Sequence, residues 1–91
     1  MTLRWTGKAQ SDLARLHAFL AHASPHAATQ TISAIVAGIA RLPVLPRIGH
    51  KLDQFSPLEV RRVLIGDYEI RYALERDVIT ILRLWHTRED R

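Results

Sequence analysis

Cysteine is absent from this 91-residue sequence, and its absence excludes several classes of protein. Without cysteine there is no disulfide framework, no thiolate zinc site and no cysteine nucleophile. Long apolar runs are also missing. The best stretch, Ile32 to Ile39, contains Ser33, Ala34 and Gly38 and falls far short of the roughly 18 to 20 residues that span a bilayer. The N-terminal residues lack the apolar segment of a signal peptide. We therefore expect a cytoplasmic protein that does not bind a membrane.

Glycine is scarce, and the common catalytic motifs are missing as well. Only four glycines occur, and none belongs to a phosphate-binding loop, a nucleophile elbow or a paired-carboxylate signature. His22 and His26 have the i, i+4 spacing of two zinc ligands, but Ser24-Pro25 interrupts the helix between them, so the spacing loses its geometric meaning. We expect neither a metal nor a cofactor.

Positive charge, in contrast, is plentiful, and arginine supplies almost all of it. The formal net charge is +4, and eleven arginines stand beside two lysines. Because the guanidinium group is a planar fork that suits phosphate and carboxylate, this bias favours a polyanion or an acidic protein as the partner. The short length predicts a single domain, 1–91.

Two amphipathic helices are expected in the first half of the sequence. Thr6 resembles an N-cap, and apolar residues recur at helical spacing from Lys8 to Ala23, with Asp12 facing mostly outward. Ser24-Pro25 then supplies a capping hydroxyl followed by a proline at the first helical position, and Pro43 ends the second helix. Because almost no residues separate the two helices, they should form an antiparallel hairpin.

The remaining segments predict strands. Thr2–Thr6 is a short first strand, and Pro43–Pro57 is a long loop. Three strands follow at Val60–Ile65, Tyr68–Glu75 and Val78–Trp85, separated by tight turns. The last of these is almost continuously apolar, which is typical of a strand inside a sheet.

The predicted order is therefore βααβββ, an α+β fold in which the helical hairpin packs on one face of a small, mostly antiparallel sheet. The helices must cover that face because their apolar stripes have no other place to pack. Polar side chains of the strands would then lie on the opposite face. Most of these are arginines, so the candidate site is sought there.

The strand arginines admit two interpretations. They could line a surface that grips phosphates or an acidic peptide, or they could form cross-strand ion pairs with the interleaved acidic residues. Adjacent residues point to opposite faces, so Arg61 and Arg62 must separate, whereas Arg83 and Trp85 share a face. Arg83 lies within an apolar strand and therefore requires either a structural ion pair or a ligand.

His86 follows the apolar strand and also admits two roles. It could donate a proton to a leaving group beside phosphate-binding arginines. Alternatively, it could cap the strand and bond to the backbone. The residues alone leave both roles open.

A series of short motifs covers nearly the whole sequence. They are Trp5 with Ala9, Asp12 and Leu13; Pro46 and Gly49; Val60–Leu64; Gly66–Tyr72; and Ile81–Asp90. Together they resemble the RelE/ParE superfamily of toxins from type II toxin-antitoxin modules, and most closely its ParE-like, plasmid-stabilisation branch.

The resemblance implies a growth-inhibiting toxin that a cognate antitoxin neutralises in a hetero-oligomer. The antitoxin's C-terminal segment is expected to be acidic and to fold on binding. ParE-like members inhibit DNA gyrase, whereas RelE-like members cleave mRNA on the ribosome. Residues expected to bind the target or the antitoxin are Arg61, Arg62, Glu69, Arg71, Arg83, Trp85 and Arg88.

Cleavage of mRNA would require an acid and a set of cations. The resemblance offers His86 as the acid, and Arg62, Arg71 and Arg83 to hold the phosphate. However, Thr87 stands where the nucleases commonly have tyrosine, and Glu69 stands where they usually have arginine. We therefore favour a toxin that acts by binding a protein over an endoribonuclease. An inactive or repurposed binding domain is the third alternative.

Overall fold

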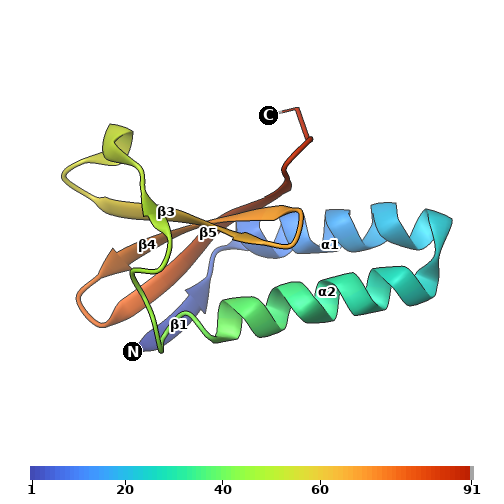
Figure 1. Ribbon diagram of the computed structural model, residues 1–91, viewed down its shortest axis with the longest axis horizontal. Coiled ribbons are helices and arrows are strands. Elements are labelled where there is room, and N and C mark those ends of the chain that lie inside the picture. The colour runs from blue at the N-terminus through green and yellow to red at the C-terminus, as the bar shows by residue number, and fades with distance from the viewer. Residues whose placement is uncertain (91) are drawn as a thin grey trace.

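The computed structural model describes residues 1–90, and Arg91 lies outside the described residues. It contains two helices and a five-stranded sheet (Figure 1). The elements are β1 (Thr2–Trp5), α1 (Gly7–Ala23), α2 (Pro25–Ala40), β2 (His50–Lys51), a 3-10 helix η1 (Asp53–Phe55), β3 (Glu59–Ile65), β4 (Tyr68–Glu75) and β5 (Val78–His86). Within residues 1–90, no helix combines the length and apolar character needed to cross a bilayer.

The sheet has the strand order β1-β5-β4-β3-β2. β1 runs parallel to β5, and every other neighbouring pair is antiparallel. β5 therefore lies inside the sheet, as its apolar sequence predicted. Figure 1 shows the helices side by side, with the sheet packed against them. The α+β arrangement and the mostly antiparallel sheet are confirmed.

Both helices begin at the caps that the sequence predicted. The Thr6 hydroxyl accepts the Ala9 N–H at 3.0 Å, and the Ser24 hydroxyl accepts the Ala27 N–H at 3.2 Å. These oxygens satisfy N–H groups that have no partner within the helix. α2 ends at Ala40, ahead of the proline expected to stop it.

The predicted loop Pro43–Pro57 contains more structure than expected. It includes η1 and the two-residue edge strand β2, which pairs with Arg61 and Arg62 of β3. The Tyr72 hydroxyl anchors the loop, because it donates to the Pro46 carbonyl at 2.9 Å and accepts the Gly49 N–H at 3.0 Å. A Cβ atom at Gly49 would lie 2.6 Å from that hydroxyl and 2.7 Å from the Arg62 carbonyl oxygen, so glycine is required.

The core lies between the helices and the sheet. Ile35, Ile39, Ile70, Tyr72 and Leu84 are almost completely buried in it. The register of β4 and β5 shifts between Arg71 and Tyr72, which pair with Arg83 and Ile81 and leave Leu82 as an extra residue. This bulge turns both Ile81 and Leu84 toward the core while Arg83 stays on the opposite face.

Side chains from the start of α1 complete the edge of β5 where β1 ends. The Thr6 hydroxyl donates to the Leu82 carbonyl at 3.0 Å, and Asp12 Oδ2 accepts the Leu84 N–H at 2.9 Å. Asp12 is therefore only 4% exposed, so its predicted outward orientation is wrong. Helical spacing places Asp12 beside the apolar stripe. Asp12 is buried because β1 pairs with β5 only as far as Ile81, and the carboxylate accepts the Leu84 N–H beyond that point.

Candidate functional site

A row of positively charged side chains crosses the sheet on the face opposite the helices. Arg62 of β3 pairs with Arg71 of β4, and Arg71 pairs with Arg83 of β5. Paired residues on neighbouring strands point to the same face, and the core residue Tyr72 follows Arg71 with the opposite orientation. We call Arg62, Arg71 and Arg83 the arginine row. The sequence predicted all three for the site, and the structure brings them together.

Trp85 lies within the same surface and contacts two members of the row. The guanidinium carbon of Arg71 is 4.8 Å from the centre of the Trp85 ring, and that of Arg83 is 5.0 Å away. Arg71 also lies over the ring of Phe55 in η1, at 5.3 Å. These are cation–π distances, and the aromatic rings hold the guanidinium planes in position. Like charges opposite one another on neighbouring strands are unfavourable, and the rings offset part of that cost.

Two buried carboxylates form ion pairs with the row. Glu69 is 2% exposed and pairs with Arg62 Nη2 at 3.3 Å and with Arg71 Nη2 at 3.7 Å. Asp12 accepts Arg83 Nε at 2.7 Å and Arg83 Nη2 at 3.1 Å, which is a bidentate pair. Arg83 therefore has the structural ion pair that its place in an apolar strand required.

The surroundings of Asp12 shift its titration. Burial alone would raise the pKa of Asp12, but hydrogen bonds from Arg83, the Leu84 N–H and Arg15 outweigh burial and lower the pKa below its ordinary value. The hydrogen bond to Asp12 likewise raises the pKa of Arg83. Both groups are charged at neutral pH, so α1 is attached to β5 by an ion pair.

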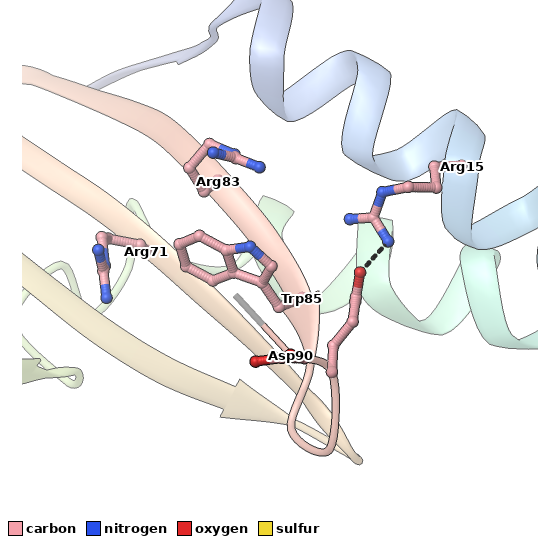
Figure 2. Close-up of a pocket in the computed structure, with 6 residues that line it drawn as sticks. Arg15, Arg71, Arg83, Trp85 and Asp90 are labelled. Atoms are coloured by element: carbon pink, nitrogen blue, oxygen red, sulfur yellow. Dashed lines mark hydrogen bonds and ion pairs between the residues drawn. The ribbon is translucent and has the colours of Figure 1, made fainter.

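A depression of about 550 Å³ opens beside the row (Figure 2). Its lining residues are Arg15, Arg71, Arg83, Trp85, Glu89 and Asp90. Figure 2 shows Arg15 approaching from α1, and a dashed line joins it to Glu89. The segment after β5 therefore lies at the depression beside the arginine row.

Arg61 lies on the other face of β3. It shares that face with Tyr72, its partner on β4, and pairs with Glu59 at 2.9 Å. Its Nη1 donates to the Gly49 carbonyl at 2.8 Å. Glu59 also binds Arg47 at 2.8 Å, and that hydrogen bond is the main reason why the pKa of Glu59 is lowered. Arg61 thus holds the loop, apart from the arginine row.

The structure also separates His86 from the row. Its partner on β4 is Tyr68, and the two rings meet edge to face at 5.1 Å. His86 Nδ1 accepts the Arg88 N–H at 3.1 Å. His86 and Arg88 line a second depression, of about 540 Å³, with Leu16, Phe19 and Leu20 of α1. Arg15 and Glu89 line both depressions. His86 and Arg88 thus lie toward the helix face, whereas Arg62, Arg71 and Arg83 lie on the opposite face.

Some residues of the site were missed by the sequence reasoning. Asp12, Arg15 and Phe55 come from distant parts of the chain, and Glu89 and Asp90 were placed in the terminal motif without a role. The requirement of Arg83 for a counter-ion was the one signal that pointed toward Asp12. Among residues 1–90, no group of three or more histidine or acidic side chains could hold a metal ion.

Comparisons with known proteins identify a family and a solved structure of similar fold. The family model described as "ParE toxin of type II toxin-antitoxin system, parDE" matches residues 3–91. No curated protein matches the sequence. Among solved structures, a chain of the "Chromosomal ParDE TA system from P. aeruginosa" has a similar fold, with a TM-score of 0.77. The two chains are 24% identical, and the match covers 94% of this chain and 95% of the other.

Proposed function

Because the chain belongs to the ParE toxin family of type II toxin-antitoxin systems, we propose that it inhibits growth by binding a protein target in the cytoplasm. By resemblance to the family, that target is DNA gyrase. We further propose that a cognate antitoxin neutralises the toxin by placing an acidic segment on the arginine row.

The observation that supports binding over RNA cleavage is the position of His86. A general acid must lie within hydrogen-bond reach of the leaving group that arginines hold. Arg71 and Arg83 face away from the helices, whereas the His86 ring packs on Tyr68 and accepts the Arg88 N–H. The histidine ring and these two arginines thus lie on opposite faces of the sheet, which favours binding over cleavage.

The arginine row fits recognition of an acidic surface. It presents guanidinium groups from three neighbouring strands, and aromatic rings hold two of them in place. Preorganised arginine and tryptophan side chains are the residue types that dominate the energetics of protein interfaces. Rigid guanidinium planes also lose less conformational freedom when a partner binds.

The test is controlled induction of the toxin in bacteria, with DNA synthesis, protein synthesis and mRNA 5′ ends followed separately. We expect DNA synthesis to fall first while messages stay intact. His86→Gln keeps a hydrogen-bond acceptor and should remain toxic, whereas Arg71→Ala should lose toxicity. Arg76→Ala, in the exposed β4–β5 turn, is the matched control. Thermal melts of the purified variants establish that each one folds.

Two results would contradict the proposal. Early loss of translation with new mRNA ends, abolished by His86→Gln, would identify a nuclease. Full toxicity of Arg71→Ala would remove the arginine row from the target interface. A supercoiling assay with purified gyrase then tests the named target directly.

A further inference from the structure

The chain's own acidic residues lie in the depression beside the arginine row. Glu89 and Asp90 follow β5 and line the depression with Arg15, Arg71 and Arg83 (Figure 2). We infer that this depression is a carboxylate-binding site which Glu89 and Asp90 occupy in the free protein. An acidic peptide segment of a partner binds there by displacing them. The inference rests on the proposed function for the existence of such a partner.

The geometry around Glu89 shows that the site accepts a carboxylate. One carboxylate oxygen pairs with Arg15 Nη1, and the other accepts the His86 N–H at 3.0 Å. Arg15 itself is oriented by Asp12 at 3.2 Å and by the Leu84 carbonyl at 3.3 Å. A guanidinium group held in this way presents a fixed fork to an incoming carboxylate.

The charges of the depression and the arginine row, taken together, balance only when the chain's own segment is counted. Four arginines, Arg15, Arg62, Arg71 and Arg83, lie among four carboxylates. Two of these are buried: Asp12 belongs to α1, and Glu69 belongs to β4. The other two are Glu89 and Asp90. Displacing that pair leaves two positive charges in excess, so an incoming segment must bring its own carboxylates.

Arg71 has hydrogen-bonding capacity that the described residues do not meet. Its Nε is buried and has no hydrogen-bond partner within residues 1–90. Its pair with Glu69, at 3.7 Å, is longer than a hydrogen bond. A buried donor without a partner is costly, and an acceptor entering the depression from a partner relieves that cost.

A carboxylate-bearing peptide fits this site better than a nucleic-acid backbone does. Glu69 and Asp12 form ion pairs with the arginines and repel a phosphodiester as well as a carboxylate. A nucleic acid, however, carries a phosphate at every nucleotide and binds through an extended excess of cations. The depression instead holds a few cations interspersed with acidic groups.

The experiment uses Trp85 as a reporter within the site. Trp5 is the one other tryptophan, so Trp5→Phe leaves Trp85 as the only source of tryptophan emission. Hexaglutamate is titrated into this protein while Trp85 fluorescence is followed, and hexauridylate is titrated in parallel. We expect saturable binding of hexaglutamate, loss of that binding in Arg71→Ala, and weaker binding of hexauridylate.

The decisive variant is Glu89→Gln with Asp90→Asn in the same background. Removing both competing charges should tighten hexaglutamate binding about 3- to 10-fold, as expected for the loss of one partly exposed ion pair and one neighbouring negative charge. Glu75→Gln with Asp77→Asn makes the same change in net charge at the exposed β4–β5 turn. That turn lies roughly 25 Å away along β5, at about 3.3 Å per residue, so screening should leave its effect small.

Each alternative result overturns the inference. An equal gain in hexaglutamate affinity in both double variants would show that the effect comes from net charge alone. Unchanged affinity in Glu89→Gln/Asp90→Asn would show that these residues do not occupy the site. Hexauridylate binding in preference to hexaglutamate would identify a nucleic-acid surface. None of these outcomes depends on toxicity, so the induction experiment can fail or succeed independently.

Discussion

Replacing Asp12 by asparagine tests the attachment of α1 to the edge of β5. The carboxylate accepts hydrogen bonds from the Leu84 N–H, from two atoms of Arg83 and from Arg15. Asparagine has nearly the same shape, but one oxygen becomes an NH₂ group that cannot accept. The new NH₂ group then faces a guanidinium N–H, so at least one hydrogen bond is replaced by a contact between two donors.

The expected cost follows from the burial of the two partners. Removing one partner of a buried ion pair costs about 3–5 kcal/mol. The side chain of Arg83 is 36% exposed, so water can solvate part of the orphaned charge. We therefore expect Asp12→Asn to lower the free energy of unfolding by about 2–3 kcal/mol, near the range for a hydrogen bond to a charged group. In a domain of this size that corresponds to a fall in Tm of roughly 10–20 °C.

Urea unfolding followed by circular dichroism measures this change. Glu75→Gln, an exposed carboxylate in the same protein, should stay within about 0.5 kcal/mol of wild type. A double-mutant cycle with Arg83→Met should recover a coupling energy between residues 12 and 83. A loss below about 0.5 kcal/mol in Asp12→Asn, or a coupling near zero, would refute the argument for this ion pair.

The same variant should change how stability depends on pH. The pKa of Asp12 is lowered in the folded protein, so its contribution is complete above its unfolded pKa of about 3.9 and is lost as the pH falls below that value. The difference in stability between wild type and Asp12→Asn should therefore shrink below about pH 4. A stability difference between the two proteins that stays constant from pH 7 to pH 3 would contradict the lowered pKa of Asp12.

Two further substitutions test the loop anchor and a turn. Tyr72→Phe removes the hydroxyl that bonds Pro46 and Gly49. The free energy of unfolding in urea should fall by about 1–2 kcal/mol, because the Gly49 N–H loses its partner. An unchanged midpoint would mean that other contacts hold the loop. Arg76 has a φ of 55°, which strains a residue with a side chain. Arg76→Gly should therefore raise the free energy of unfolding by up to about 1 kcal/mol. A lower Tm would show that contacts of the arginine side chain stabilise the turn by more than this backbone strain costs.

Local patterns were sufficient for most of the fold. The capping residues Thr6 and Ser24-Pro25 predicted where the two helices begin. Alternation along Tyr68–Glu75 predicted both the strand and its buried face. The two-residue strand β2 was missed because so short a strand carries no periodicity. It exists because Tyr72 holds the loop beside β3.

The candidate site was predictable only in part. Alternation along β5 placed Arg83 and Trp85 on one face, because strand geometry is a local property, whereas the pairing of Arg71 with Arg83 depends on the register of β4 and β5. The role of Asp12 depended on where β1 stops, since only then does the backbone of Leu84 need a partner from the helix. Likewise, the return of Glu89 over Arg15 joins positions 74 residues apart, which no local pattern specifies.

The pairing of β1 and α1 with β5 also governs when the toxin can form during synthesis. The Thr6–Leu82 and Asp12–Arg83 contacts join positions 76 and 71 residues apart. Such non-local contacts form late because the intervening chain must first be ordered. Since Arg83 and Trp85 are themselves on β5, a nascent chain on the ribosome has no assembled arginine row until that strand has been made. The surface that we propose to bind the target and the antitoxin is therefore complete only after nearly all of the chain has been translated.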